Sequence, residues 1–293
     1  MKNINSVVKY FGGKGGMYKQ ILEYFPKPDY DTYIEPFSGG YSVGLHMPYI
    51  PPIEIYNDME KNIFSLFYVL QKKELFEKFK EKCDLSIYSD EFRQLYKENL
   101  KRPFTMDDDD IVQRAFEYFY VNRTSHNGIG GFSINTVVRR NMSKSVSDML
   151  TTVDNLFDFH NRISKTIISS TDGISLIERY GKTDNVFMYC DPPYHHSTRT
   201  STRYDVDMDD DLQEKFIDSC INAKCKLLIS GYACDAYKRL EQNGFRRVDF
   251  VVHTVRGKQN ITKKDKVESL WLNYELPPKD EKNDSEECNS LWI

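Results

Sequence analysis

The sequence lacks the features that mark several common classes of protein. No apolar stretch is long enough to span a membrane, and the N-terminus has no apolar segment typical of a signal peptide. The six cysteines form no CxxC pair and show no Cys/His spacing suited to zinc. We therefore expect a cytosolic, cytoplasmic protein with free thiols and no metal site.

An excess of positive charge is also absent, because 40 Lys and Arg stand against 44 Asp and Glu, a formal net charge of −4. The overall charge therefore does not indicate a nucleic-acid-binding protein, although a local basic groove is compatible with it. Aromatic residues, in contrast, are plentiful, with 20 Tyr and 18 Phe. Such rings suit base stacking and an ordinary apolar core equally.

Segments typical of strands alternate with segments typical of helices. The apolar patterns predict strands at 33–37, 53–56, 186–190, 226–230, 248–255 and 267–274, and helices at 62–70 and 211–223. This alternation predicts an α/β fold with a mostly parallel sheet that helices cover on both faces. We divide the chain into a core at 1–70 and 166–276, an inserted helical region at 71–165 and a polar tail at 277–293.

The most informative segment is Asp191-Pro192-Pro193-Tyr194, which follows the apolar run 186–190. The prolines make a rigid turn and lack N–H groups, so that a carbonyl is left free to accept a hydrogen bond. Together with Asp191, that carbonyl can bind an amino group while Tyr194 stacks on the attached ring, as a base extruded from DNA requires. A strand-ending turn with a capping aspartate explains these residues about equally well by themselves.

Two further segments put polar residues at predicted strand ends. EPFSGG at 35–40 is a glycine loop that permits close approach of a ligand, and it lacks the Lys-Ser/Thr of a P-loop. Asp58 follows the next strand, where an acidic residue suits either ribose hydroxyls or a helix cap. Since ligands of such sheets bind at the carboxyl ends of the strands, we expect Glu35, Asp58 and Asp191 to line one crevice.

The motif KYFGGK at 9–14 joins an aromatic ring, glycines and a cation in a loop. The order KYFGGK, EPFSGG, Asn57-Asp58 and DPPY, with a helical insertion before the last, resembles the Dam-type, D12 class of DNA adenine-N6 methyltransferases. The resemblance covers roughly residues 7–275, and the ordered set of motifs is far more specific than DPPY alone.

This resemblance implies a Rossmann-like, S-adenosylmethionine-dependent methyltransferase sheet, with 71–165 as a mostly helical target-recognition region. The residues implied to bind S-adenosylmethionine are Tyr10, Lys14, Glu35, Ser38, Gly39, Asp58, Asp172 and Asp191. The Asp191 carboxylate and the Pro192 carbonyl would accept hydrogen bonds from the adenine amino group, and Tyr194 would stack on the flipped base. The implied reaction is an in-line transfer of a methyl group to that nitrogen.

Residues 118–147 contain arginines, a lysine and several asparagines but no acidic residue. Such side chains read base edges and neutralise phosphates, although a glycine-rich surface loop would also explain them. The piece FYVNRTSHNGIGGF resembles the family's target-recognition hairpin, which implies double-stranded DNA as partner. The implied DNA-binding residues are Arg123, His126, Asn127, Arg139, Arg140 and Lys144.

The sequence departs from the family's pattern at three positions. GATC-reading members carry an aromatic residue in place of His126 and an arginine in place of Gly131, so we expect a target other than GATC. Tyr41 stands where the glycine loop usually has a small residue, and its ring either crowds the cofactor or packs away from it.

Other interpretations stay open at this point. A catalytically silent relative that binds nucleic acid would keep the fold, and enzymes that methylate protein amides use a related motif that begins with Asn rather than Asp191. The acidic runs 107–110 and 205–211 precede helical patterns, which favours helix caps over metal sites. The resemblance also allows a companion restriction endonuclease as a partner.

Overall fold

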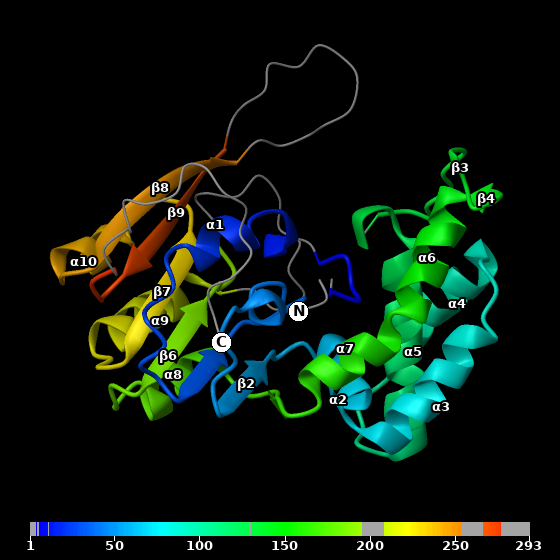
Figure 1. Ribbon diagram of the computed structural model, residues 1–293, viewed down its shortest axis with the longest axis horizontal. Helices are drawn as coiled ribbons and strands as arrows, with labels where there is room; N and C mark the ends of the chain where they lie inside the picture. The colour runs from blue at the N-terminus through cyan, green and yellow to red at the C-terminus, as the bar shows by residue number, and fades with distance from the viewer. Residues whose placement is uncertain are drawn as a thin grey trace, which may run out of the picture.

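The computed structural model describes residues 4, 6–10, 12–128, 130–194, 208–252 and 266–276. A twisted sheet flanked by helices forms one side of the molecule, and a cluster of helices forms the other (Figure 1). The predicted tail at 277–293 lies outside the described residues.

The main sheet has seven strands in the order β5-β2-β1-β6-β7-β9-β8. Their bounds are β1 Thr32–Glu35, β2 Ile53–Asn57, β5 Ile167–Ser169, β6 Val186–Cys190, β7 Lys226–Gly231, β8 Arg246–Val252 and β9 Lys266–Leu272. Strands β5, β2, β1, β6 and β7 are parallel, whereas β9 is antiparallel to both of its neighbours. The mixed α/β fold with a mostly parallel sheet is therefore confirmed.

Two strand predictions need correction. β1 ends at Glu35, two residues before the predicted end, because Pro36 has no N–H to continue the ladder. β5 was not predicted at all, since it is only three residues long and Ile167 is exposed. The last residues predicted for β8, 253–255, lie outside the described chain.

Alternate side chains of the strands enter two separate apolar layers. Tyr33, Tyr56 and Phe187 point to the layer shared with α2, while Ile34 and Met188 point to the layer shared with α8 and α9. The relevant helices are α1 Tyr18–Leu22, α2 Lys61–Gln71, α8 Gly173–Tyr180, α9 Asp210–Ile221 and α10 Lys238–Gln242. Both faces of the sheet are covered, as a buried parallel sheet requires.

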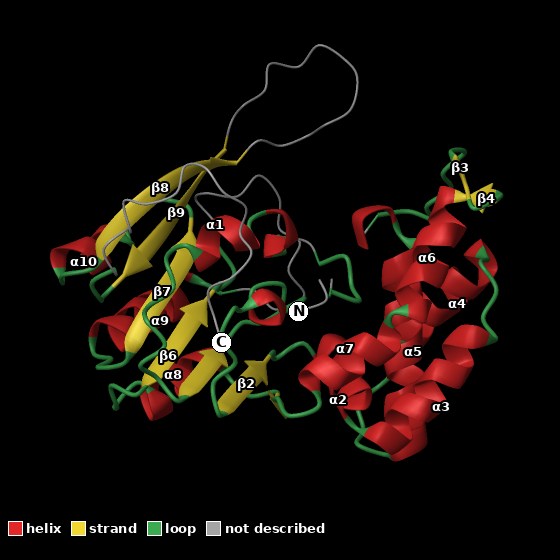
Figure 2. Ribbon diagram, viewed as in Figure 1, coloured by secondary structure: helices red, strands yellow, loops and turns green. Residues whose placement is uncertain are grey.

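The segment between β2 and β5 folds mainly as helices (Figure 2). These are α3 Lys73–Asp84, α4 Asp90–Asn99, α5 Asp108–Thr124, α6 Lys144–Asp154 and α7 Leu156–Ile163, with a short hairpin of β3 Val138–Arg139 and β4 Met142–Ser143. α5 packs against α2, α3 and α4, so that it forms the centre of the cluster. The turn residues of the hairpin, Arg140 and Asn141, have φ of 54° and 59°, the left-handed conformation typical of a tight two-residue turn.

The acidic runs cap helices, as predicted from their position. The Asp107 carboxylate accepts from the backbone N–H groups of Asp109 and Asp110 at the start of α5. Asp209 does the same for Leu212 in α9, while residues 205–207 of the second run are not described. None of the helices in the described part of the chain combines the length and apolar character that a membrane-spanning segment needs.

Candidate active site

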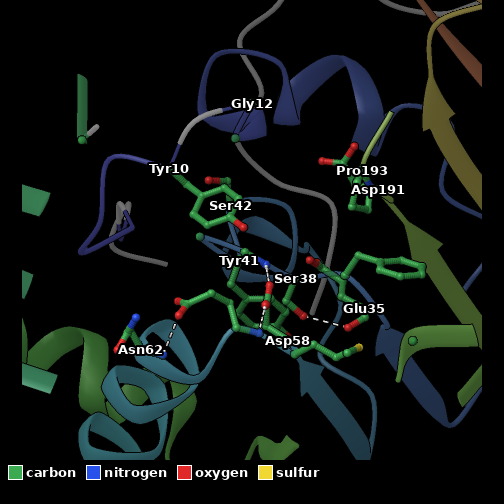
Figure 3. A pocket seen from close by; sticks show the side chains of 18 of the residues that line it. Tyr10, Gly12, Glu35, Ser38, Tyr41, Ser42, Asp58, Asn62, Asp191 and Pro193 are labelled. Carbon is green, nitrogen blue, oxygen red and sulfur yellow. Dashed lines mark hydrogen bonds between the residues drawn. The ribbon is translucent and has the colours of Figure 1, made fainter. Parts of the chain in front are cut away.

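The carboxyl ends of three neighbouring strands open into one cavity of about 970 Å³. Glu35 ends β1, Asp58 follows β2 and Asp191 follows β6, and all three line this cavity (Figure 3). The prediction that these carboxylates share one crevice is confirmed. The space is large enough for a ligand of cofactor size.

The glycine loop after β1 is held by its own hydrogen bonds. The Ser38 hydroxyl donates to the Glu35 carbonyl (2.7 Å) and accepts from the backbone N–H of Asn57 (3.0 Å). Gly39 has φ +48°, and a Cβ there would stand 2.5 Å from the Tyr10 ring. The loop therefore needs glycine both for its backbone conformation and for the close approach of Tyr10.

The cavity holds two carboxyl groups whose proton affinity is raised. Burial raises the pKa of Glu35 to about 8, although the hydroxyl of Tyr33 donates to it and opposes the shift. Burial likewise raises the pKa of Asp58 to about 6, against hydrogen bonds from the backbone N–H groups of Gly39 and Glu60. Both sites therefore favour a ligand that brings positive charge or hydroxyl donors.

Asp191 accepts hydrogen bonds from two side chains of the protein. Lys14 Nζ lies 2.7 Å from Asp191 Oδ1, and the Ser230 hydroxyl donates to the same oxygen at 2.8 Å. The following prolines differ in their carbonyls. The Pro193 carbonyl accepts a hydrogen bond from the Gln213 side chain (2.7 Å), whereas the Pro192 carbonyl accepts no hydrogen bond from any described residue. The segment Asp191–Tyr194 thus offers the second carboxylate oxygen of Asp191 and the Pro192 carbonyl as acceptors.

Tyr194 is buried and bound by charged groups. Its hydroxyl accepts from Lys14 (2.6 Å) and donates to Glu268 through a very short hydrogen bond. Burial alone would lower the pKa of Lys14, but the charges of Asp191 and Glu268 raise it above its ordinary value. The lysine therefore stays an ammonium. The Tyr194 ring contacts Tyr232 edge-on and is not among the residues that line the cavity.

Sequence reasoning missed Glu268, which lies in β9 and is 3% exposed. Its carboxylate is 3.5 Å from Lys14 Nζ in addition to its bond with Tyr194. Burial raises the pKa of Glu268, against the opposing charge of Lys14. A single glutamate in a strand does not indicate a site residue in the sequence. Only the pairing of β9 with β7 brings Glu268 close to the segment Asp191–Tyr194.

Two other predicted positions have clear structural partners. Asp172 lines the cavity, but its carboxylate also caps α8 by accepting from the backbone N–H groups of Ile174 and Ser175. The Tyr41 ring is fully buried, and its hydroxyl donates to Glu54 (2.7 Å). Tyr41 is among the residues that line the cavity, and its ring is held beneath the glycine loop by close contact with Gly44 and by the bond to Glu54.

The predicted DNA-binding residues are only partly free of internal partners. His126 and Asn127 are exposed at the end of α5, whereas Arg123 is partly buried and donates to the Asp148 carbonyl (3.2 Å). Arg139 lies 2.9 Å from an Asp148 oxygen and Lys144 pairs with the other. Asp148, one residue beyond the acid-free stretch, thus offsets part of its positive charge.

Arg140 lies at the tip of the hairpin. It approaches Asp154 of α6 at 3.8 Å. The six predicted DNA-binding residues do not line the large cavity, so they form a separate group near the end of α5 and on the hairpin.

The residues around the cavity fit S-adenosylmethionine by chemistry. Asp58 suits a pair of ribose hydroxyls, Glu35 suits an ammonium group, and the apolar side chains of Phe37, Met59 and Ile174 suit a purine ring. Gly39 leaves room for such a ligand beside Tyr10. No described group of His, Cys, Asp or Glu has the arrangement of a metal site.

Comparison with known proteins agrees with this chemistry. The family described as "D12 class N6 adenine-specific DNA methyltransferase" matches residues 10–270. The chain is 29% identical over 283 residues to modification methylase StsI of Streptococcus sanguinis, with 93% of this chain aligned to only 39% of that protein. It is also 26% identical to type II methyltransferase M.MjaIII of Methanocaldococcus jannaschii, over 92% of this chain and 99% of the relative.

A third relative is type II methyltransferase M.CviBI of Paramecium bursaria Chlorella virus NC1A, 24% identical over 64% of this chain and 68% of that protein.

Proposed function

Since this chain belongs to the D12 class of N6 adenine-specific DNA methyltransferases, we propose that it methylates the amino group of adenine within a specific sequence of double-stranded DNA. The methyl donor is S-adenosylmethionine, which supplies an electrophilic methyl group when it is bound in the cavity. The names of the relatives support a type II modification enzyme. We propose a restriction endonuclease as its companion.

The arrangement at Asp191 and Pro192 carries this proposal. The amino lone pair of adenine is delocalised into the ring and is a weak nucleophile. Hydrogen bonds from that amino group to Asp191 and to the Pro192 carbonyl, to which no described residue donates, would return electron density to nitrogen. Asp191 is already oriented by Lys14 and Ser230, so it stabilises positive charge on nitrogen without reorganising.

The remaining site residues bind and orient the two substrates. The donor site, which would bind the methyl donor S-adenosylmethionine, would be formed by Tyr10, Lys14, Ser38, Gly39, Asp58 and Asp172. Glu35 would face the ammonium group of that ligand. Burial of Glu35 supports this assignment, because a cation that enters beside it compensates the cost of its ionisation. Tyr194 would stack on the flipped base, which requires its ring to face the cavity from which it is now set back.

The test is to incubate the protein with S-adenosylmethionine and unmethylated duplex DNA, digest the DNA and measure N6-methyladenine by mass spectrometry. We expect methylated adenine to appear only when both substrates are present. Binding of S-adenosylmethionine without any methyl transfer to varied duplexes would instead indicate a silent, DNA-binding relative.

We further propose that the recognised DNA sequence differs from GATC. The absence of an arginine side chain at Gly131 would contribute to this difference. A Cβ on Gly131 would have no described atom within 4 Å, so a side chain can begin there in open space. Sequencing of the modified bases identifies the site, and clean GATC methylation would contradict the proposal. Gly131→Arg should add preference for a guanine in that site, because arginine binds guanine with two hydrogen bonds.

A further inference from the structure

The side chain of Asn122 forms a two-way hydrogen bond with the backbone of a distant residue. The backbone N–H of Lys9 donates to Asn122 Oδ1 (2.8 Å), and Asn122 Nδ2 donates to the Lys9 carbonyl (3.1 Å). Asn122 is 5% exposed and lies in the last turn of α5. Its amide thus imitates one rung of a β-sheet between the N-terminal loop and the helical region.

Lys9 is fixed from two other directions as well. Its Nζ donates to the carbonyls of Arg123 (3.1 Å) and Ser125 (3.4 Å). Beside the Asn122 amide, a Cβ on Gly128 would stand 1.9 Å from the Lys9 carbonyl oxygen and 3.0 Å from Asn122 Nδ2. Since Gly128 also has φ +83°, the close approach of this loop to Lys9 depends on glycine.

One side of this contact belongs to the donor site. Tyr10 follows Lys9 directly; its ring rests on Gly39 of the glycine loop, and its Cβ lies beside Gly40. Asn122 itself lines the large cavity together with Val121. A ligand that orders Tyr10 must therefore also favour the position of Lys9 that Asn122 holds.

The other side belongs to the residues proposed to bind DNA. Arg123 follows Asn122, and exposed His126 and Asn127 come after one more turn. The backbone N–H of His126 donates to the Gly131 carbonyl (2.9 Å), so these residues form one closed loop. Displacement of Asn122 would move the start of this loop.

We propose that Asn122 is a positioning residue that couples donor binding at Tyr10 to DNA binding by the loop after α5. This inference rests on the proposed function, because it assumes that the two sites take S-adenosylmethionine and DNA. The coupling is reciprocal: each ligand tightens the binding of the other by the same factor. Asn122 would contact neither reacting group.

The test measures the dissociation constant of S-adenosylhomocysteine by calorimetry, with and without a saturating unmethylated duplex that the wild-type protein modifies. We expect the duplex to tighten binding in the wild type by a factor in the typical range of roughly 5 to 150. Asn122→Asp keeps the size of the side chain and the acceptor for Lys9 N–H, but it places a carboxylate oxygen against the Lys9 carbonyl. We expect its coupling factor to fall to near one.

The matched control is Asn222→Asp, because Asn222 is exposed and bonds only within its own helix, to the Asp218 carbonyl. It should keep the wild-type factor. Gly128→Ala disturbs the same contact, because its Cβ would meet both the Lys9 carbonyl oxygen and Asn122 Nδ2, and it should lose the coupling in the same way. A wild-type factor near one, or a wild-type factor retained in Asn122→Asp or Gly128→Ala, overturns the proposal.

Failure of both variants to fold would overturn it too, since the contact would then serve folding alone. Failure of the proposed function would give a different result, namely the absence of N6-methyladenine from duplexes treated with the wild-type protein.

Discussion

Asp191 enters the proposed reaction with one oxygen already hydrogen-bonded by Lys14 and Ser230. This arrangement fixes the carboxylate and leaves its other oxygen for a substrate. Asp191→Ala removes the acceptor, so we expect methyl transfer to fall by at least about 10²-fold to 10³-fold, the usual effect of losing one preorganised group. Radioactive methyl incorporation into DNA measures this loss.

Ser230→Ala is the comparison, since it removes one donor to Asp191 and leaves the carboxylate in place. It should retain clearly more activity than Asp191→Ala. Substantial transfer by a folded Asp191→Ala protein would refute the role assigned to this residue.

Glu35 gives a pH dependence of stability with a defined sign. Its pKa in the folded protein is about 8, above the ordinary value of 4.5, so folding favours the protonated form. This contribution is fully present below pH 4.5 and is lost as pH rises through 8. Glu35→Gln lacks the titration, so the wild type should lose on the order of 4 kcal/mol relative to this variant between pH 5 and pH 9.

Urea unfolding of both proteins at several pH values measures this difference. A constant difference between them across this range would mean that Glu35 is ionised in the folded protein at no cost. Addition of S-adenosylmethionine at about pH 7, where its amino group is protonated, should recover part of the loss, because the ammonium group compensates the carboxylate.

At the scale of elements, ion pairs connect the β3–β4 hairpin to α6. Asp148 of α6 pairs with Arg139 of β3 and with Lys144. Asp148→Asn frees both cations, so we expect tighter binding to duplex DNA and a slope of log affinity against log salt that is steeper by about one. Titrations of labelled duplex at several salt concentrations measure both quantities.

Asp84→Asn is the matched control, because Asp84 forms a similar pair with Lys80 on α3, away from the hairpin. It should leave the affinity for DNA unchanged. Weaker binding by Asp148→Asn would mean that the cations bind DNA only when Asp148 orients them.

Elements and their ends were more predictable from the sequence than their pairing. Apolar runs followed by Glu35, Asp58 and Asp191 indicated three strands with carboxylates at one edge, and the structure confirms that edge. Glu268 and Asn122 could not be predicted, since their partners lie 74 and 113 positions away and depend on strand order and helix packing. β5 escaped because so short a strand has no periodicity to detect.

At the scale of the whole molecule, a buried ion pair joins the helical region to the sheet. Arg162 of α7 donates to both carboxylate oxygens of Glu54 in β2 at 2.6 and 2.8 Å, and both side chains are almost inaccessible. Arg162→Ala leaves the Glu54 charge buried without its partner. We therefore expect a loss of about 3–5 kcal/mol in the free energy of unfolding, measured by urea denaturation.

Lys238→Ala is the control, because the pair between Lys238 and Asp235 is exposed. It should change stability little. An equally small effect of Arg162→Ala would show that water or another cation reaches Glu54 once the arginine is gone.

The acids that face the hairpin cations also bear on how the protein would find its target. Because the net charge is −4 and Arg139, Arg140 and Lys144 all lie near acids of α6, we expect attraction to arbitrary DNA to be weak. Each chance encounter should therefore be brief, and long sliding along one duplex is disfavoured. We expect a distributive enzyme, which dissociates after each methyl transfer and reaches separate sites on one DNA molecule in independent visits.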